Sequence, residues 1–588
     1  MSPPAPNFNA LWARALVDEL VRGGVREAVV CPGSRSSPLA LACAESPGLA
    51  TRSILDERSA AFFALGAAKA TQRPTLVIAT SGTAGAHFYP AILEAEASGV
   101  PLIALTADRP PELHGWGAPQ TLDQQHLFGA HVGLFADLGV PEPLALPHLR
   151  ATAARAVAHA GARRGPVHLN APFREPLAPV PGPIPSDLRD AKAVRHLRGA
   201  AVPGAAALDE AARELSRRPR GVIVCGPSDA DGALPAAVGA LAAKLGYAVL
   251  AEAASQVRYA LPGCVSHYDS ILRDERWARA LRPDAVVRAG GGLTSKALQA
   301  WLGAAFTVVI SDRDAIVDPD HDAALALLGD PAATCLALAG AVASPPGAAA
   351  LPAPPAPSAP PALSAPPALS ALWRAAEDRA AAACDRALLA GDRLTEPLVA
   401  RETFAALRED ALVFVSSSMP IRDADAYADR APPGVRVLSN RGANGIDGVV
   451  SSALGAAAAT GRPTTLLIGD LALLHDLHGL IAARRLGVAL TIVCVDNDGG
   501  GIFSFLPIAQ HTSHFEPLFA TPQGVDLLQV AALCGARLHR PGTPEALRTA
   551  LREARGLSLI AVRTDRARNV EDHRALHQAV AAALGSPP

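Results

Sequence analysis

The chain has 588 residues, of which 50% are hydrophobic, and a formal net charge of −2. The balanced charge argues against a protein that binds nucleic acid or an anionic membrane surface through excess basic residues, and no run of about 18 uncharged apolar residues is present to span a bilayer. The length suffices for roughly three or four domains.

The cellular compartment is indicated by the start of the chain and by its cysteines. The first residues lack the basic and apolar segments of a secretory signal. Eight cysteines are scattered along the chain without CxxC spacing, which argues against a zinc site or a disulfide framework. The sequence therefore predicts a cytoplasmic protein.

Two segments far apart in the chain are nearly identical. ALGAAKATQRPT begins at Ala64 and ALGAAAATGRPT begins at Ala453, and one of their two differences pairs Lys69 with Ala458. Each segment is followed by an apolar run, a helix-like stretch, a Gly-Val pair and a second apolar run. Short apolar runs that alternate with longer helical segments are typical of parallel sheets. We therefore predict two homologous α/β domains with a binding cleft between them.

The predicted elements follow in chain order. A helix over 9–22 and a strand in REAVVCPG open the first copy, which ends with the strand PVHLNAP near Pro172. The proline-rich EPLAPVPGPIPSD reads as a linker. A second alternation starts with GVIVCGPSDADG at Gly221 and continues through YAVLAEA, DAVVRAGGG and a helical TSKALQAW. Residues 344–367 are almost entirely Pro, Ala and Ser, as in an extended connector.

The fold class that follows is α/β, with three doubly wound parallel-sheet domains in the order copy, spacer, copy. The predicted boundaries are 1–185 for the first copy, 186–343 for the central domain, 344–370 for the linker and 371–588 for the second copy. The central domain has a strand, a glycine-rich turn and a helix but no GxGxxG motif. A Rossmann-like spacer is therefore favoured over a nucleotide site.

Polar residues follow two neighbouring strands of the second copy. TTLLI ends at Gly469 and Asp470, and TIVCV is followed by Asn497 and, after one residue, by Gly499. Open parallel sheets bind ligands at these carboxyl ends. The Asp470 carboxylate, the Asn497 amide oxygen and the Gly499 carbonyl oxygen are suited to a hard cation such as Mg²⁺, which could hold a diphosphate. The alternative is that Asp470 is only a helix cap.

The 27 residues from Asp470 to Asn497, followed by GGGIFSFLP, resemble the metal-diphosphate signature of thiamine diphosphate enzymes. The resemblance implies that thiamine diphosphate binds together with Mg²⁺ or Mn²⁺. It also implies that 1–185 is a pyrimidine-binding domain and 371–588 a diphosphate-binding domain of the same fold, with Gly469 among the cofactor contacts.

The resemblance also requires a carboxylate for the aminopyrimidine ring, and Glu57 in SILDERSAAFFALG fits. A glutamate hydrogen-bonded to a ring nitrogen would promote the tautomerism that activates the cofactor. The alternative is a first-turn glutamate stabilised by the helix dipole. The repeat offset places Ile446 opposite Glu57, where it resembles the apolar wedge that bends the cofactor, although a buried isoleucine is most often part of a core.

Four longer motifs are more specific. CPGSRSSPL at 31–39, TADRP at 106–110, SNRGANGIDG at 439–448 and DNDGGGIFSFLP at 496–507 resemble the 2-succinyl-5-enolpyruvyl-6-hydroxy-3-cyclohexene-1-carboxylate (SEPHCHC) synthases, the MenD family. The likeness covers nearly the whole chain. It implies a transferase of menaquinone biosynthesis that decarboxylates 2-oxoglutarate on thiamine diphosphate and adds the succinyl carbanion equivalent to isochorismate by 1,4-addition.

Both implied substrates are dianions, and guanidinium groups bind carboxylates in bidentate geometry. Four arginines lie in loops at predicted strand ends, namely Arg35, Arg109, Arg422 and Arg441. The alternative is that each is a solvated surface residue, as an arginine in a loop ordinarily is. Ile502, Phe503 and Leu506 follow the predicted metal-binding turn and are expected in the substrate pocket. The alternative is that they only pack within a helix. The substrate pocket that the resemblance implies consists of Ser34, Arg35, Arg109, Gln120, Lys296, Ser418, Arg422, Arg441, Ile502, Phe503 and Leu506.

The chain departs from the family pattern in two ways. Leu471 and Asp498 replace the third residue of Gly-Asp-Gly and the second of a pair of asparagines. Neither place requires a metal-binding side chain, so the cofactor prediction is unchanged. Ala297 stands where some relatives have arginine, so that one carboxylate contact is missing or supplied elsewhere.

Two other functions remain open at this point. The chain could be another thiamine diphosphate-dependent 2-oxoacid decarboxylase or an acetohydroxyacid-type synthase, which a flavin in the central domain would support. It could also be a silent regulatory protein, although binding alone would not require Glu57 beside Asp470 and Asn497. One site would need both copies, and relatives assemble them across subunits, so we expect a homodimer core and a homotetramer.

Overall fold

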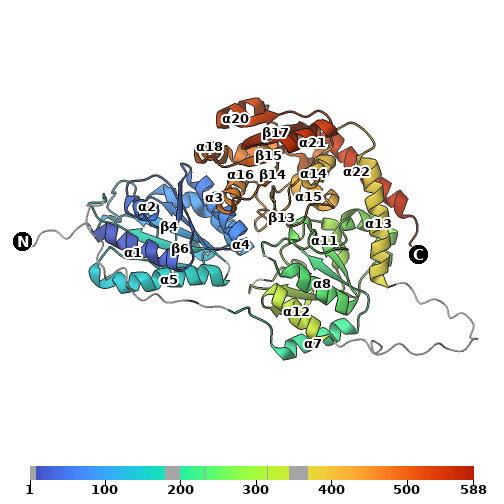
Figure 1. Cartoon of the computed structure of the whole chain (residues 1–588), viewed down its shortest axis with the longest axis horizontal. Helices are drawn as coiled ribbons and strands as arrows, with labels where there is room; N and C mark the ends of the chain where they lie inside the picture. Colours follow the sequence, from blue (N-terminus) through green and yellow to red (C-terminus); the bar gives the residue numbers. More distant parts are fainter. Residues whose placement is uncertain are drawn as a thin grey trace, which may run out of the picture. The chain divides into compact units, whose positions relative to one another are not determined.

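The computed structural model describes residues 8–163, 165–178, 196, 199–230, 232–313, 316–342 and 368–587. They form three parallel sheets with helices on their faces (Figure 1), as predicted. The connector at 344–367 and most of the first proline-rich linker lie outside these residues. The chain divides into two compact units. The first comprises 1–198, 406–420 and 435–566, and the second comprises 199–405, 421–434 and 567–588.

The first sheet belongs to the first unit and has the strand order β2-β1-β3-β4-β6-β5, with every neighbouring pair parallel. Its apolar strand residues alternate between two cores, so that helices cover both faces. Helices α1, α2 and α5 pack on one face, and α3 and α4 on the other. The strands are β1 (Glu27–Val30), β2 (Ala50–Ser53), β3 (Thr75–Ala79), β4 (Leu102–Asp108), β5 (Leu134–Asp137) and β6 (Val167–Pro172). The helices are α1 (Phe8–Arg22), α2 (Ser37–Ala44), α3 (Glu57–Thr71), α4 (Tyr89–Ser98) and α5 (Leu146–Arg163).

The third sheet, in the same unit, has the order β13-β12-β14-β15-β17-β16. Counted from its first strand, this is the order of the first sheet, which confirms the predicted duplication. Its strands are β12 (Leu412–Val415), β13 (Arg436–Leu438), β14 (Thr464–Gly469), β15 (Leu490–Asp496), β16 (Arg537–His539) and β17 (Leu557–Arg563). Its helices are α16 (Val449–Thr460), α17 (Asp470–His475), α18 (Leu477–Leu486), α19 (Thr512–Phe515), α20 (Leu527–Cys534) and α21 (Pro544–Glu553).

The repeated segments form α3 and β3 in the first copy and α16 and β14 in the second. The two copies have an equivalent hydrogen bond as well as a similar sequence. The Thr71 hydroxyl donates to the carbonyl oxygen of Ala67 at 2.7 Å, and the Thr460 hydroxyl donates to that of Ala456 at 2.7 Å. Each bond closes the last turn of its helix.

Helices α3 and α16 lie side by side (Figure 1) and share one hydrophobic core. The glycine of each repeated Leu-Gly pair lies at their contact. A Cβ on Gly66 would overlap the carbonyl oxygen of Ser452, and a Cβ on Gly455 would overlap that of Phe63. The repeated glycines therefore let the two helix backbones touch, which joins the first and third sheets into one unit.

The second unit contains the middle sheet, in the order β11-β10-β9-β7-β8 with parallel neighbours. This is a common doubly wound order. Its strands are β7 (Gly221–Cys225), β8 (Ala248–Ala251), β9 (Ala285–Ala289), β10 (Phe306–Ser311) and β11 (Ala323–Leu328). Its helices are α7 (Ala205–Ser216), α8 (Leu234–Leu245), α9 (Tyr268–Leu272), α10 (Glu275–Ala280), α11 (Lys296–Leu302), α12 (Pro331–Ala341), α13 (Leu369–Leu388), α14 (Glu396–Ala405), most of α15 (Met419–Tyr427) and α22 (Arg566–Leu584). No helix within the described ranges is both long and apolar enough to cross a membrane.

The helix contact yields a first prediction. Alanine normally stabilises a helix relative to glycine by roughly 0.5–1 kcal/mol, but at Gly66 and Gly455 the methyl group meets backbone that cannot move aside. We expect Gly66→Ala and Gly455→Ala each to lower the free energy of unfolding by about 1–3 kcal/mol, measured by urea denaturation.

Gly340 provides the control, because it lies in α12 and a Cβ there would meet no atom within 4 Å. Gly340→Ala should be neutral or slightly stabilising. Equal stability of all three variants would show that α3 and α16 are not in backbone contact.

Candidate active site

The predicted site residues of the first unit lie at the carboxyl ends of parallel strands. Because parallel strands all end at the same edge, each sheet gathers its own set on one side. The loops after β1, β4, β12, β13 and β15 contain, in that order, Ser34 and Arg35, Arg109, Ser418, Arg441, and Asn497, and the first helical residues after β2 and β14 are Glu57 and Asp470.

Two arginines bring like charges together at the edge of the first sheet. Arg35 is buried and pairs through Nη2 with Oε1 of Glu175 at 3.2 Å. Arg109 donates from Nη2 to Oε1 of Gln120 at 3.3 Å and from Nη1 to the hydroxyl of Ser81. Burial lowers the pKa of Arg109, and the positive charge of Arg35 lowers it further. Two neighbouring guanidinium groups create a positive potential that favours a bound carboxylate.

The Arg109 loop is supported by a buried polar network. Asp108 accepts the backbone N–H of Arg109 at 2.7 Å and the side-chain amide of Asn170 at 2.9 Å. Gln124 donates to Oδ1 of Asn170 at 3.0 Å and accepts the backbone N–H of Gly82 at 3.1 Å. Burial raises the pKa of Asp108 despite these bonds. The network links the loops after β3 and β4, so it fixes the direction in which Arg109 leaves the sheet.

His168 completes this network as a neutral imidazole. Its Nε2 lies 2.8 Å from the hydroxyl of Thr106, which in turn donates to Oδ1 of Asn170 at 2.9 Å. Burial, followed by the nearby His126, lowers the pKa of His168 to about 3. The histidine therefore donates its Nε2 proton to Thr106 and carries no charge at neutral pH. Sequence reasoning missed this network, whose signal was a pair of polar residues two apart on each of two apolar strands.

Glu57 is the first residue of α3, but it does not cap the helix. The cap is Asp56, whose side chain accepts the backbone N–H of Ser59 at 2.8 Å. The Ser59 hydroxyl donates to Oδ1 of Asp476 at 3.1 Å, and Asp476 also accepts the backbone N–H of Ser451 at 2.7 Å. Asp476 thus ties the start of α3 to the start of α16, and no local sequence signal pointed to it. The side chain of Glu57 is partly exposed.

Asp470 is the first residue of α17 and is only 5% exposed. One carboxylate oxygen accepts the backbone N–H of Leu471 at 2.8 Å, and the other accepts that of Gly499 at 2.8 Å. The second bond crosses from the end of β14 to the turn after β15, so Asp470 does more than a helix cap would. Burial raises the pKa of Asp470 to about 6, and the charges of Asp496 and Asp498 contribute to the rise.

The turn after β15 requires glycine at 499. Gly499 has φ +146°, and a Cβ there would press on the carbonyl oxygen of Ala520 and on the guanidinium of Arg566. Arg566 donates from Nε to the carbonyl oxygen of Asn497 at 3.2 Å and pairs with Glu516 at 3.0 Å. The turn is therefore held from two sides, and Arg566 and Glu516 are further residues that sequence reasoning missed.

Apolar side chains follow directly after this turn. Ile502 and Phe503 lie in the short helix η6 (Gly501–Phe505) and are partly buried, whereas Leu506 is 37% exposed. Phe503 packs against Phe519 with 5.9 Å between ring centroids. Ile446 is partly buried and contacts the core shared by α3 and α16. It lies a few residues before Val449, where α16 begins. Ile502, Phe503 and Leu506 thus follow the turn directly, whereas Ile446 contacts the helix core.

Several residues near the strand ends have left-handed backbone conformations. Gln120, Ser418 and Asp498 have φ values of +54°, +75° and +54°. Such conformations are uncommon for residues other than glycine, and they persist only where the surrounding structure enforces them. Each of the three is itself a predicted site residue or adjoins one.

Lys296 and Arg422 belong to the second unit. Lys296 is exposed at the start of α11, where Ser295 is the cap. Arg422 lies within α15 and not in a loop as predicted, and the next residue, Asp423, has Oδ1 2.7 Å from Nε2 of His573. On the same helix, Asp425 pairs with the buried Arg258 at 2.8 Å. These two carboxylates anchor the helix that carries Arg422.

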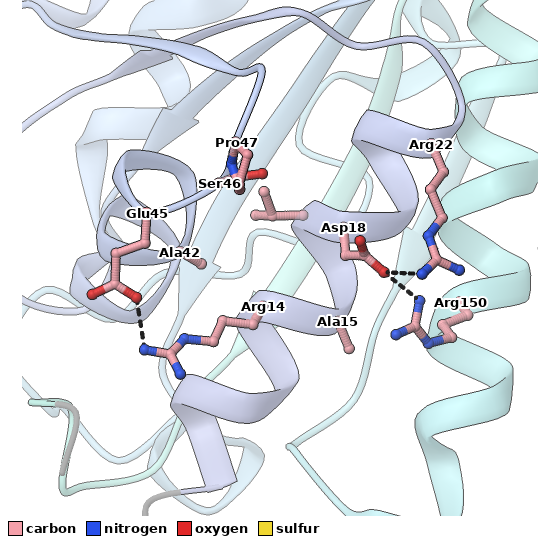
Figure 2. A pocket seen from close by; sticks show the side chains of 10 residues that line it. Arg14, Ala15, Asp18, Arg22, Ala42, Glu45, Ser46, Pro47 and Arg150 are labelled. Carbon is pink, nitrogen blue, oxygen red and sulfur yellow. Dashed lines mark hydrogen bonds and ion pairs between the residues drawn. The ribbon is translucent and has the colours of Figure 1, made fainter. Parts of the chain in front are cut away.

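A cavity of about 310 Å³ lies among α1, α2 and α5 (Figure 2). Its charged side chains face one another. Asp18 pairs with Arg22 at 3.1 Å and with Arg150 at 3.0 Å, and Arg14 pairs with Glu45 at 2.6 Å. No predicted site residue lines this cavity, which is therefore separate from the strand-end site.

Family models match each part of the chain. The model described as "thiamine pyrophosphate enzyme, N-terminal TPP binding domain" matches residues 12–127, the middle domain of thiamine pyrophosphate enzymes matches 195–339, and their C-terminal TPP binding domain matches 424–562. The first and last matches contain Glu57 and Asp470, respectively.

Individual relatives are similar over their full length. The chain is 54% identical to a SEPHCHC synthase from Myxococcus xanthus, with 99% of both chains covered. It is 42% identical to the synthase of the same name from Bacillus velezensis, with 96% of both covered, and 41% identical to that from Halobacterium salinarum, with 95% and 96% covered. By this full-length similarity, the chain belongs to the SEPHCHC synthase family of thiamine pyrophosphate enzymes.

Proposed function

We propose that the chain is a transferase of menaquinone biosynthesis that decarboxylates 2-oxoglutarate and adds the succinyl group to isochorismate by 1,4-addition, giving SEPHCHC. The names of its full-length relatives support this reaction. The observation that carries the proposal is the buried Asp470 carboxylate, which joins the ends of β14 and β15 where a cofactor diphosphate would bind. When bound, thiamine diphosphate supplies a carbon nucleophile and an electron sink for the loss of CO₂.

A divalent cation, Mg²⁺ or Mn²⁺, fits the donor atoms of this turn. Asp470 offers a carboxylate, Asn497 an amide oxygen and Gly499 a backbone carbonyl, which are the oxygen ligands that hard cations prefer. The raised pKa of Asp470 supports the assignment, because a cation would offset the burial of its charge beside Asp496 and Asp498. In the parts of the chain that the structure describes, no three His, Cys, Asp or Glu residues cluster as an alternative metal site.

Glu57 is assigned the proton of the aminopyrimidine ring. Its position at the first turn of α3, held by Asp56 and Asp476, supports this role, since a proton-transfer group must be fixed. Ile446 would support the bent cofactor, and Gly469 would contact it beside Asp470.

The substrate carboxylates are assigned to the arginines. Arg35 and Arg109, with Ser34 and Gln120, would bind one carboxylate at the first sheet, where two guanidinium charges are close together. Ile502, Phe503 and Leu506 would exclude water from the reacting atoms. The remaining polar contacts that we assign to the substrates are Ser418 and Arg441 of the first unit and Lys296 and Arg422 of the second.

We also propose a homodimer core and a homotetramer. Two large apolar side chains next to site loops support an assembly that covers them. Leu55, two residues before Glu57, is 77% exposed, and Trp116, in the loop that leads to Gln120, is 84% exposed. Light scattering after size exclusion would measure the oligomeric state.

The domain boundaries are a further part of the proposal. They are 1–185 for the pyrimidine-binding domain, 186–343 for the central domain, 344–370 for the linker and 371–588 for the diphosphate-binding domain. Each family match falls within one of these ranges. A cytoplasmic location is proposed as well, and it is supported by the eight free cysteines.

Asp470→Asn tests the cation site. The variant keeps the side-chain shape but loses the charge, and we expect thiamine diphosphate binding in the presence of Mg²⁺ to weaken by at least roughly 10- to 100-fold. Isothermal titration calorimetry measures this. Asp209→Asn, on the exposed face of α7 in the second unit, is the control, because it makes the same change of charge outside the turn. Wild-type affinity in Asp470→Asn would rule out the metal assignment.

Glu57→Gln tests the proton role. The amide keeps a hydrogen-bonding group but cannot exchange a proton, so the cofactor should still bind while turnover falls by about 10²- to 10⁴-fold. Calorimetry and a steady-state assay measure the two effects separately. Glu210→Gln, on the exposed face of α7, should retain full activity. A Glu57→Gln enzyme with more than about half of wild-type turnover would contradict the role.

Arginine-to-lysine variants test the substrate assignments. At Arg35, Arg109, Arg422 and Arg441, lysine retains the charge but loses the fork, so kcat/KM should fall by about tenfold or more. The four should differ in kind. Lysine at a residue that binds 2-oxoglutarate should slow CO₂ release in the absence of isochorismate. Lysine at a residue that binds isochorismate should slow only product formation.

The exposed Arg217→Lys provides the matched control. If all four site variants equalled it both in CO₂ release from 2-oxoglutarate alone and in product formation from both substrates, the pocket would be misplaced. A decarboxylase with another substrate would then be the better interpretation.

A further inference from the structure

We propose that the buried ion pair of Lys69 and Glu94 positions the loop that carries Arg441, and so directs this guanidinium toward a substrate carboxylate. The inference rests on the substrate role proposed above for Arg441. It makes Lys69 and Glu94 positioning residues, although both belong to the first α/β copy and Arg441 belongs to the second.

The pair lies deep between two helices. Lys69 in α3 is 1% exposed and Glu94 in α4 is 2% exposed, with Nζ of the lysine 3.5 Å from Oε1 of the glutamate. Lysine and glutamate are almost never buried this completely without a specific partner. Both residues reach beyond each other to the same loop of the second copy.

That loop follows β13 and is held through its backbone on both sides of Arg441. Nζ of Lys69 donates to the carbonyl oxygen of Ser439 at 3.0 Å. Oε1 of Glu94 accepts the backbone N–H of Gly442 at 3.0 Å, and Oε2 accepts that of Ala443 at 2.7 Å. Hydrogen bonds to ionised groups are shorter and stronger than neutral ones. The backbone on either side of Arg441 is therefore fixed, while its side chain remains only partly buried.

Close packing reinforces the hydrogen bonds. A Cβ on Gly442 would lie 2.6 Å from the Ser98 hydroxyl and 2.8 Å from Cβ of Ala97, so the loop rests directly on the end of α4. The Ser98 hydroxyl itself donates to Oε1 of Glu94 at 2.5 Å. The loop thus has little freedom to shift along the surface of the first copy.

The fold itself does not need these charges. The position that matches Lys69 in the second copy is Ala458. Counted back from the Gly-Val pairs at Gly99 and Gly487, the position that matches Glu94 is Ala482. The second copy builds the same strand order without these charges. Buried ion pairs can often be replaced by apolar residues without loss of stability, because desolvation offsets their attraction. A function in positioning accounts for a costly pair that only one copy contains.

The carboxylate of Glu94 also suits its task better than an amide would. An ionised carboxylate only accepts hydrogen bonds, and here its two oxygens accept two successive backbone N–H groups. In Glu94→Gln, one of the two N–H groups would face an NH₂ donor. The change keeps the volume of the side chain and removes half of the loop contact together with the ion pair.

The first test is hydrogen exchange on the full-length chain. In Glu94→Gln, the amides of Gly442 and Ala443 should exchange at least about tenfold faster than in the wild type. The double variant Lys69→Met with Glu94→Gln removes both charges of the pair, so no unpaired buried charge remains there to cause misfolding. The same two amides should exchange faster in this variant as well. Glu19→Gln is the matched control, because Glu19 is equally buried and pairs with Arg150 at 3.0 Å, away from the loop. Wild-type exchange at both amides in Glu94→Gln would overturn the proposal.

The second test is a double-mutant cycle with Arg441→Ala. Glu94→Gln alone should lower kcat/KM by roughly 10- to 100-fold, because a small misplacement of a substrate-binding group is costly. In the Arg441→Ala background the same change should cost less than about twofold, since its target is gone. If the losses of kcat/KM in the two single variants multiply in the double variant, Glu94 does not act through Arg441. A wild-type enzyme inactive on these substrates would refute the proposed function, while the exchange test would still decide whether the pair holds the loop.

Discussion

The contact between α3 and α16 is the constraint on which the first unit depends. Gly66 and Gly455 bring two helix backbones together, so that the helices of two different sheets share one core. Phe62 and Phe63 are fully buried there. Because interiors are close-packed, this contact leaves little room for the two sheets to shift against each other. The loops at their edges can therefore be fixed by contacts across the two copies.

Buried carboxylates that accept backbone N–H groups fix those loops. Asp108 holds the Arg109 loop, Glu94 the Arg441 loop, Asp470 the turn at Gly499, and Asp476 the start of α16. Burying a charge is unfavourable unless hydrogen bonds replace the lost water. A carboxylate that depends on particular backbone groups therefore disfavours alternative loop positions. The loops at the strand ends are therefore held in defined positions.

The sequence predicted the features that depend on local pattern. Short apolar runs predicted the strands, the repeat predicted two sheets of one order, and Asp470 and Asn497 follow strand ends as expected. The supporting residues could not be found in this way. Glu94 meets Gly442 across 348 positions, and Ser59 meets Asp476 across 417. A helical glutamate or aspartate looks like a solvated surface residue until its distant partner is known.

The differences between the two copies are more informative about chemistry than the identities. The shared Leu-Gly and the threonines that close α3 and α16 serve helix packing and helix ends, which both copies need. The positions at which the copies differ do not serve this shared packing. Glu57 corresponds to Ile446 in the other copy, and Lys69 corresponds to Ala458. A duplicated fold can hold one asymmetric ligand only if matching positions acquire different side chains. Charged residues present in one copy and apolar in the other are therefore where we would look first for function in such a chain.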